Sequence, residues 1–194
     1  MMSFTPTQKR ILKAFKDLLI ENGYRNATTH KIAESAQVNE TTIFRNFKDK
    51  RGLLQATIDQ YLADIDRLKQ EQKDTGNLEK DLTAMADKYQ KFVFDHQAIF
   101  MVGLRESFSL PEVNKDVEKI PIHFKSLLVS YLKKMQEKRL ISQDLDIEML
   151  AMNFVWLNFG FFLTQSRFTS SFLNITHEEF LAKNIRSFVK ELKY

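Results

Sequence analysis

Polar and basic side chains that suit contact with a polyanion are concentrated between residues 28 and 50. This segment reads TTHKIAESAQVNETTIFRNFKDK, and hydroxyl, amide and cationic groups recur along it. Hydroxyl groups and backbone N–H groups at the start of a helix can hold a phosphate oxygen, and Arg, Asn and Thr side chains can hydrogen-bond to base edges. The chemistry that these residue types favour is recognition of a nucleic acid.

The residue types that enzymes use are not arranged for catalysis. The chain has no cysteine, which excludes a disulfide framework, a thiolate metal site and a thiol nucleophile, and favours a reducing compartment. The histidines, at 30, 96, 123 and 177, form neither H-E-x-x-H nor H-x-x-H, and no serine lies in G-x-S-x-G. No two of the five glycines are closer than 24 residues, which excludes a phosphate-binding glycine loop. We expect no metal, no cofactor and no enzyme activity.

The surplus of positive charge is confined to the first third of the chain. Residues 1–60 hold ten Lys and Arg against six Asp and Glu, whereas residues 61–194 hold nineteen of each, so the net charge of +4 is entirely N-terminal. A basic segment beside a neutral, aromatic-rich one favours an N-terminal part that faces a polyanion and a C-terminal part that buries apolar groups. A chance excess of basic residues on solvated helix faces would explain the charge distribution equally well.

Neither a signal peptide nor a membrane span is expected. Residues 1–10 contain no apolar run of the kind found in secretory signals, so we expect a cytoplasmic protein. The most apolar stretch, residues 149–163, is 15 residues long and contains Asn153 and Asn158. A bilayer span needs about 20 apolar residues, so this stretch is expected to form a buried helix and the protein to have no membrane partner.

Apolar residues spaced three and four apart recur along the chain and predict an all-α fold. Asn22-Gly23 and the segment 73–77 are expected to end helices. About nine helices are predicted, at residues 6–22, 29–36, 40–46, 50–72, 78–96, 98–108, 115–138, 146–167 and 177–192.

Capping residues mark the starts of several predicted helices. Thr5-Pro6-Thr7-Gln8 and Thr176-His177-Glu178-Glu179 have the pattern of a capping box, in which the first and fourth residues satisfy each other's backbone N–H groups. Thr28-Thr29, Asn39 and Asp49 are candidate N-caps of the second, third and fourth helices.

The short helices at 29–36 and 40–46 are joined by Gln37-Val38-Asn39 and preceded by a longer helix. These are the three elements of a helix-turn-helix module. The apolar residues of the two short helices are expected to pack inward: Ile32, Ala33, Ala36, Ile43 and Phe47. Polar residues of the second short helix are left facing outward, where they can reach base edges: Glu40, Thr41, Arg45 and Asn46.

The same residues resemble the DNA-binding signature of the TetR family of transcriptional regulators. The resemblance spans residues 8–54 and is most specific over Thr42-Ile43-Phe44-Arg45-Asn46-Phe47-Lys48-Asp49-Lys50, where the family pattern is T-hydrophobic-aromatic-x-x-F-x-x-K. The remaining residues are similar only in helix number and length to that family's ligand-binding and dimerisation domain. The resemblance implies an N-terminal helix-turn-helix DNA-binding domain at 1–52 and a C-terminal helical effector-binding and dimerisation bundle at 53–194.

The resemblance also implies a role for each matching residue in binding double-stranded DNA. Phosphate contacts are implied for Thr29, Thr42 and Lys50, and a base or phosphate contact for His30. Contacts in the major groove are implied for Asn39, Glu40 and Thr41, and contacts to bases or backbone for Arg45 and Asn46. Lys48 belongs to the same basic cluster. An ordinary structural interpretation exists beside these roles, because Thr29 and Asn39 are also good N-caps and exposed basic residues are common.

Two residues depart from the family pattern. The family usually has glycine in the turn between the two short helices, and Gln37 must then adopt a turn conformation that costs it more than it costs glycine. The family usually has tyrosine where this chain has Phe44, so the hydroxyl group that could contact DNA is missing. Phe44 is expected to be either a structural residue or a residue that contacts a thymine methyl group, and the sequence favours neither.

Phenylalanine is concentrated in the C-terminal part, where thirteen of the seventeen lie between residues 92 and 194. One use of this apolar surface is a homodimer, because the resemblance implies that the last two helices pair with those of a second chain about a two-fold axis. Candidate interface residues are Leu181, Ile185, Phe188, Leu192 and Gly160. The alternative is that they form ordinary intramolecular core.

A second use of the apolar surface is a cavity for a small effector. The residues expected to line it are Phe92, His96, Met101, Leu104, Phe124, Leu128, Met152 and Trp156. Polar groups that could orient a ligand there are His96, Arg105, Asn153 and Gln165. Methionine and aromatic residues at helical spacing are more often core than pocket, so a plain core is the alternative.

Functions from three classes are compatible with the sequence. The favoured one is a homodimeric repressor that binds a palindromic operator and is released by a small apolar effector. The second is a helical lipid- or hydrophobe-binding protein without a DNA role, which leaves the N-terminal motif and charge unexplained. Salt dependence of duplex binding separates these two, because phosphate contacts release counterions. An enzyme with a site assembled from distant residues comes third.

Overall fold

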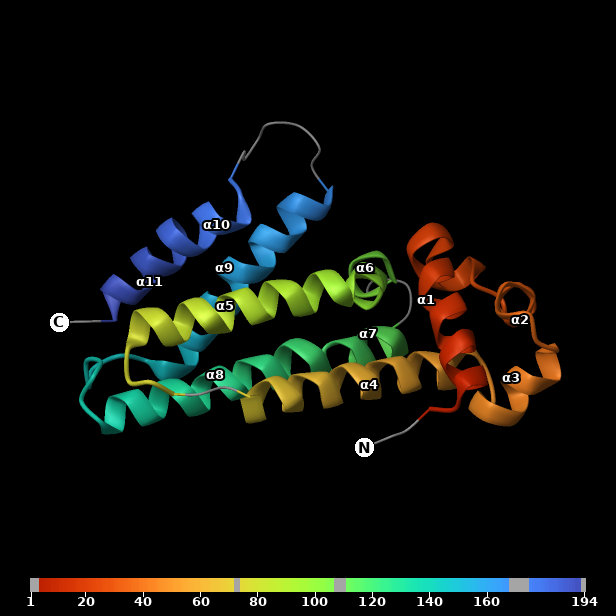
Figure 1. Cartoon of the computed structure of the whole chain (residues 1–194), viewed down its shortest axis with the longest axis horizontal. Coiled ribbons are helices and arrows are strands. Elements are labelled where there is room, and N and C mark those ends of the chain that lie inside the picture. The colour runs from red at the N-terminus through yellow and green to blue at the C-terminus, as the bar shows by residue number, and fades with distance from the viewer. Residues whose placement is uncertain (1–3, 72–73, 107–110, 168–174, 193–194) are drawn as a thin grey trace. The chain divides into compact units, whose positions relative to one another are not determined.

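Helices make up all the regular structure in the residues that the structure describes, which are 4–71, 74–106, 111–167 and 175–192 (Figure 1). This computed structural model confirms the predicted all-α class. The α-helices are α1 (Pro6–Asn26), α2 (Thr29–Ala36), α3 (Glu40–Phe47), α4 (Lys50–Glu71), α5 (Leu78–Asp95), α6 (Gln97–Glu106), α7 (Pro111–Val117), α8 (Lys119–Glu137), α9 (Ile147–Arg167), α10 (His177–Glu179) and α11 (Arg186–Glu191). A π-helical segment, η2 (Phe180–Ile185), joins the last two. The predicted helix ends at 72 and 108 lie outside the described residues.

Helix boundaries differ from the prediction mainly near proline and glycine. The single helix predicted at 115–138 is two helices, α7 and α8, which separate at Glu118. Pro111 and Pro121 lie in their first turns, where a missing N–H breaks no intrahelical hydrogen bond. Helix α1 extends to Asn26, beyond the predicted end, but its helical backbone is interrupted at Gly23, where φ is 75°.

The predicted helix caps are present. The Thr5 side chain accepts a hydrogen bond from the Gln8 backbone while the Gln8 side chain accepts one from the Thr5 backbone, and Thr176 and Glu179 form the same capping box. The Asn39 side chain accepts from the Thr41 N–H at 2.9 Å. Asp49 Oδ1 accepts from the N–H of Gly52 at 2.7 Å, at the start of α4.

The chain forms two compact units. Unit 1 comprises residues 1–66 and 96–120, and unit 2 comprises residues 67–95 and 121–194. In unit 1, α1, α2, α3 and the first part of α4 bury a shared set of fully enclosed side chains: Ile11, Phe15, Leu19, Ile32, Ile43, Leu53 and Leu54. This core holds the two short helices in place. The functional division at residue 52 that the family resemblance implies remains a prediction.

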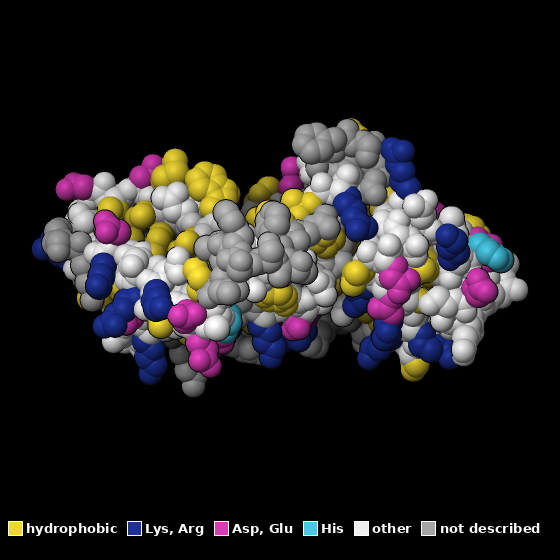
Figure 2. All heavy atoms as spheres, turned by 90° about the horizontal axis from the view of Figure 1, so that it is seen from above, with side chains coloured by type: hydrophobic (Ala, Val, Ile, Leu, Met, Phe, Trp, Pro, Cys, Tyr) yellow, Lys and Arg dark blue, Asp and Glu magenta, His cyan; other side chains and the backbone are white. Residues whose placement is uncertain are grey.

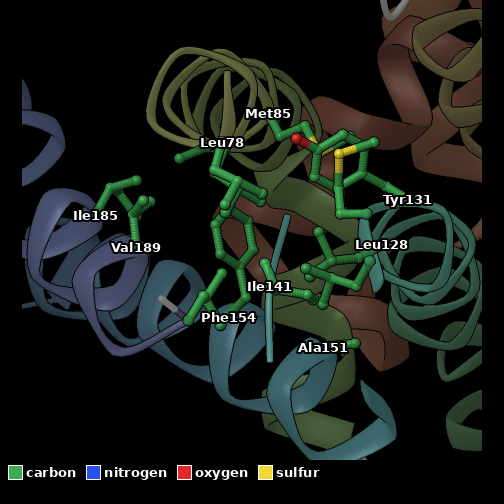
Figure 3. Close-up of a cluster of buried hydrophobic side chains, with 14 of the residues drawn as sticks. Leu78, Met85, Leu128, Tyr131, Ile141, Ala151, Phe154, Ile185 and Val189 are labelled. Atoms are coloured by element: carbon green, nitrogen blue, oxygen red, sulfur yellow. The ribbon is translucent and has the colours of Figure 1, made fainter. Parts of the chain in front are cut away.

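The core of unit 2 is built from α5, α8, α9 and the C-terminal helices. In Figure 3, Ile185 of η2 and Val189 of α11 point toward the cluster that contains Leu78 and Phe154. Ile185 and Leu192 have no exposed surface. These two candidate dimer residues are therefore intramolecular core, whereas Leu181 and Phe188 are only partly buried against the cluster.

Helix α9 is longer than the apolar run in the sequence. Residues 147–166 are helical over 20 residues and are, by length and composition alone, apolar enough to cross a membrane. The helix predicted at 146–167 is confirmed, because α9 begins one residue later and ends at the predicted residue. Phe154 and Phe162 are buried, and Asn158 accepts hydrogen bonds from the buried Gln90 side chain at 2.8 Å and 3.1 Å. These contacts agree with the predicted buried helix of a core.

Candidate nucleic-acid interface

Helix α3 has one face packed in unit 1 and one face open to solvent. Ile43 is fully buried and Phe47 is 6% exposed, because apolar residues four apart lie on one side of a helix. Thr41, Phe44 and Arg45 are exposed on the other side. The outward orientation predicted for Thr41 and Arg45 is confirmed, and the ring of Phe44, whose position the sequence left open, is exposed beside them.

The start of α3 is tightly organised. Asn39 Oδ1 accepts hydrogen bonds from both the backbone N–H and the hydroxyl of Thr41, at 2.9 Å and 2.8 Å. The hydroxyl oxygen of Thr41 keeps its lone pairs, so it can still accept from a base or a bound water. Glu40 lies in the first turn, where a carboxylate is favoured by the positive end of the helix dipole. Asn39 thus fixes the direction of the residue most suited to a base edge.

Asn46 positions α3 instead of facing outward as predicted. Its side chain is half-buried, donates to the Thr42 carbonyl oxygen at 2.7 Å and accepts from the Gln8 side chain at 3.3 Å. Gln8 belongs to the first turn of α1 and also closes the capping box with Thr5. Asn46 therefore links the end of α3 to the start of α1.

Lys50, at the first position of α4, lies against the end of α1. Its ammonium group donates to the carbonyl oxygen of Tyr24 at 2.8 Å and to that of Arg25 at 3.2 Å, and it lies 4.4 Å from the centre of the Tyr24 ring. A cation near the carbonyl end of a helix stabilises that end. The phosphate contact that the resemblance implies for Lys50 remains a prediction beside this structural role.

The backbone on both sides of α3 adopts conformations that L-residues rarely use. Gln37 ends α2 with φ 53° and ψ 50°. This is the left-handed conformation, which was expected at a turn position where the family usually has glycine. Lys48 ends α3 with φ 68°. A Cβ atom at Gly52 would lie 1.7 Å from the carbonyl oxygen of Phe47. The first turn of α4 therefore needs glycine to pass the end of α3.

The remaining predicted DNA contacts lie at the start of α2 and the end of α3. The N-cap of α2 is Thr28, whose hydroxyl accepts from the Lys31 N–H at 3.3 Å. Thr29 is the first helical residue and so does not serve as the cap. His30 and Lys48 are exposed. Figure 2 shows Lys and Arg side chains on the visible face of the part that carries α1, α2 and α3, with acidic side chains between them.

The residues predicted to line an effector cavity are distributed over both units. Unit 2 holds Phe92, Phe124, Leu128, Met152 and Trp156, whereas unit 1 holds His96, Met101 and Leu104. The ring of Phe124 lies 4.5 Å from that of Tyr89 and 5.6 Å from that of Phe92. Trp156 is 56% exposed. Within unit 2, Phe124 therefore lies close to Phe92, whereas Trp156 faces solvent.

Phe124 and Leu128 line a small apolar cavity in unit 2. Its volume is about 20 Å³, and its other walls are Leu68, Met85, Lys88, Leu127 and Phe154. Ligand sites for small molecules usually measure about 300–1,000 Å³. The cavity is therefore closed to any ligand larger than water in this conformation.

The polar groups expected to orient a ligand have partners in the protein or face solvent. His96 stacks on Tyr61 with ring centres 3.7 Å apart, and its Nε2 atom lies 3.3 Å from a carboxylate oxygen of Asp64. Burial raises the pKa of the Tyr61 hydroxyl. Gln165 donates to the Ile175 carbonyl oxygen at 3.0 Å. Arg105 points to the Ile20 carbonyl oxygen at 3.5 Å, and Asn153 is exposed. Within the described ranges, no group of three or more His, Asp and Glu side chains could hold a metal ion.

Comparisons with known proteins agree with the helix-turn-helix arrangement. Residues 11–57 match the family model described as bacterial regulatory proteins, tetR family. Over 185 residues the chain is 35% identical to YvkB, an uncharacterized HTH-type transcriptional regulator of Bacillus subtilis strain 168, and the match covers 95% of this chain and 96% of YvkB. The chain belongs to the TetR family. It is accordingly a DNA-binding transcriptional regulator.

Solved structures show that the TetR-family fold extends over the whole chain. A bacterial regulatory protein in the tetR family from Rhodococcus RHA1 matches with a TM-score of 0.75 at 16% identity, covering 98% of each chain. The transcriptional regulator FadR from Bacillus subtilis, in complex with stearoyl-CoA, matches with a TM-score of 0.71 at 19% identity, covering 95% of this chain and 96% of that one. At these identities the likeness shows the fold alone.

Sequence reasoning on this TetR-family protein missed three residues that hold α3 and the helices around it in place. Gln8 and Tyr24 contact residues far along the chain, and no local pattern marks such a pair. Gly52 could have been recognised from the sequence, because a helix is less stable with glycine than with alanine. Glycine in the first turn of a helix therefore indicates that a larger side chain does not fit there.

Proposed function

We propose that this TetR-family protein is a homodimeric repressor that binds an inverted-repeat operator through α3 and leaves it when a small apolar effector binds. The two-sided α3 is the observation that carries this proposal. Ile43 holds the helix in unit 1, while Thr41 and Arg45 face solvent. A helix that packs by one edge and presents donors and acceptors from the other is suited to the major groove.

The DNA-binding face is proposed to combine base reading with phosphate contacts. Thr41 and Arg45 contact base edges, together with Asn39 and Glu40 at the start of α3. Phosphates are held by Thr29, His30, Thr42, Lys48 and Lys50 around that helix. Residues 1–52 then serve DNA binding and residues 53–194 serve effector binding and dimerisation. Because the target is chromosomal DNA, we place the protein in the cytoplasm.

A second copy of the chain is proposed to cover the outer face of α9. Met149 and Trp156 are 51% and 56% exposed on that helix, and Gly160 follows one turn later. A Cβ atom at Gly160 would meet no atom within 4 Å, although glycine in a helix costs about 1 kcal/mol relative to alanine. Close approach of a second helix accounts for glycine at this position. A two-fold axis there gives the dimer two α3 helices for two half-sites.

The effector is proposed to bind in unit 2 by opening the small cavity at Phe124 and Leu128. Its walls are apolar apart from Lys88. Met85 is an unbranched wall residue that can change rotamer to make room. The complex of FadR from Bacillus subtilis with stearoyl-CoA makes stearoyl-CoA the first probe to choose. Since a ligand shifts an equilibrium only by its differential affinity, the effector must prefer the state that does not bind DNA.

Operator release measured on the full-length protein tests this proposal. Stearoyl-CoA is expected to lower operator affinity at least tenfold, whereas coenzyme A alone leaves it unchanged. Leu127→Trp, which fills the partly buried wall of the cavity, is expected to keep DNA binding and lose the response. Binding of stearoyl-CoA without any sequence-specific duplex binding would instead favour the hydrophobe-binding alternative.

A further inference from the structure

Phe44 places an apolar ring on the outward face of α3. Its side chain is 48% exposed, whereas Ile43 and Phe47 on the inner side are 0% and 6% exposed. Thr41 lies one helical turn before it and Arg45 directly after it, so the ring stands between a hydroxyl and a guanidinium. The sequence left two roles open for Phe44, a structural role and contact with a thymine methyl group. The exposure of the ring favours the second, because a structural residue would be covered by the rest of unit 1.

The chemistry of the phenyl ring limits what it can recognise in DNA. The side chain of Phe44 has no donor or acceptor, so it cannot hydrogen-bond to a phosphate or a base edge. The apolar group exposed in the major groove is the 5-methyl group of thymine, which the other three bases lack. Packing the ring on that methyl group removes apolar surface of both from water, which favours thymine at that position.

We propose that Phe44 selects a thymine in each operator half-site by packing its ring on the 5-methyl group. The thymine lies beside the base that Thr41 or Arg45 contacts, because the three side chains share the outward face of α3. This inference rests on the proposed function, since it requires α3 to enter the major groove. Phe44 thereby contributes to sequence preference through an apolar contact. A tyrosine at the same position would add a hydroxyl group that can hydrogen-bond to DNA.

Replacing thymine by uracil tests the contact directly, because uracil forms the same base pair and lacks only the methyl group. An operator is first selected from a randomised duplex library with the full-length protein, and each thymine is then replaced by uracil. At one position in each half-site, uracil is expected to lower affinity about fourfold for one half-site and about fifteenfold for both, as for loss of one buried methyl group. Uracil outside the half-sites is expected to change nothing.

Variants of Phe44 show whether the ring is the group that senses the methyl. Phe44→Ala is expected to bind the thymine and uracil operators equally, and Phe44→Leu to keep part of the preference. Both variants are expected to fold, because the ring is half exposed. Wild-type protein that binds every uracil operator like the parent, or a Phe44→Ala variant that still discriminates, overturns the inference.

The thymine contact and DNA binding through α3 fail in different ways. An operator that is selected but shows no uracil effect at any position overturns the thymine contact and leaves DNA binding through α3 intact. Failure to select any sequence-specific duplex contradicts the proposed function and the thymine contact with it.

Discussion

The ammonium group of Lys50 lies 2.8 Å from the carbonyl oxygen of Tyr24 and 4.4 Å from the centre of its ring. The two residues are 26 positions apart, and their contact joins the start of α4 to the end of α1. The family resemblance implies a phosphate contact for the same lysine. Lys50 therefore combines a structural contact with a proposed DNA contact, and the two can be measured separately.

Lys50→Ala is expected to lower the free energy of unfolding without DNA by about 1–2 kcal/mol, because it removes charge-assisted hydrogen bonds to two carbonyl oxygens. It is also expected to weaken binding to every duplex and to reduce the salt slope by about one unit for each phosphate that is no longer neutralised. Lys48→Ala is the control, since Lys48 is exposed and should affect only DNA binding. An unchanged salt slope for Lys50→Ala would assign Lys50 a purely structural role.

Gln8→Glu is expected to weaken operator binding several-fold with little change in stability. A glutamate can still accept the Thr5 N–H and so preserve the capping box, but it cannot donate to Asn46 Oδ1. The free energy of unfolding should change by less than about 1 kcal/mol, because the capping box is kept and only the 3.3 Å hydrogen bond from the partly buried Gln8 side chain is lost. Gln8→Ala, which removes both hydrogen bonds, should in addition destabilise the protein. Normal operator affinity of Gln8→Glu would show that the link to Asn46 does not position α3.

Gly52→Ala and Gly160→Ala are expected to have opposite effects on stability. The added Cβ at position 52 would lie 1.7 Å from the Phe47 carbonyl oxygen, so unfolding should become easier by more than about 2 kcal/mol. At position 160 no atom lies within 4 Å, so alanine should stabilise the helix by up to about 1 kcal/mol. Denaturant unfolding at a concentration that keeps the protein monomeric measures both. Equal effects would contradict the steric explanation of Gly52.

Asp81 is a buried carboxylate that ties the 74–77 segment and α8 to α5. It is 1% exposed and accepts hydrogen bonds from the backbone and hydroxyl of Thr75, from the Gly76 N–H, and from the Tyr131 hydroxyl at 3.1 Å. Tyr131→Phe is expected to cost about 1–2 kcal/mol, and Asp81→Ala about 3 kcal/mol or more, because it leaves several donors without acceptors. Denaturant unfolding measures both, and a neutral Asp81→Ala would contradict this structural role.

The same pair predicts a dependence on alkaline pH. Burial, followed by the charge of Asp81, raises the pKa of Tyr131 above its ordinary value of 10.0. A pKa that is raised in the folded state contributes stability below pH 10, and that stability is lost as the pH rises further. Wild-type protein should lose stability more steeply above pH 10 than Tyr131→Phe does. The two proteins should have parallel profiles between pH 7 and pH 9.

Local features of this fold were predictable from the sequence, and long-range ones were not. The cap at Asn39 and the left-handed turn at Gln37 depend on residues within one or two helical turns; the local pattern identified the cap, and the family resemblance indicated the turn. The Gln8–Asn46 contact joins residues 38 positions apart, and helical periodicity carries no information on such pairs. Periodicity likewise marked Ile185 as apolar without distinguishing core from interface, and packing against α5 decided it.

The measurement that tests the central claim most directly is sequencing of genomic fragments retained by the full-length protein at two salt concentrations. A few fragments sharing an inverted repeat are expected to remain bound at the higher salt, because base contacts add to phosphate contacts. Arg45→Ala should then change which bases are preferred within that repeat. Retention that disappears at the higher salt without any shared sequence, in protein freed of bound apolar ligand, would contradict sequence-specific recognition by α3.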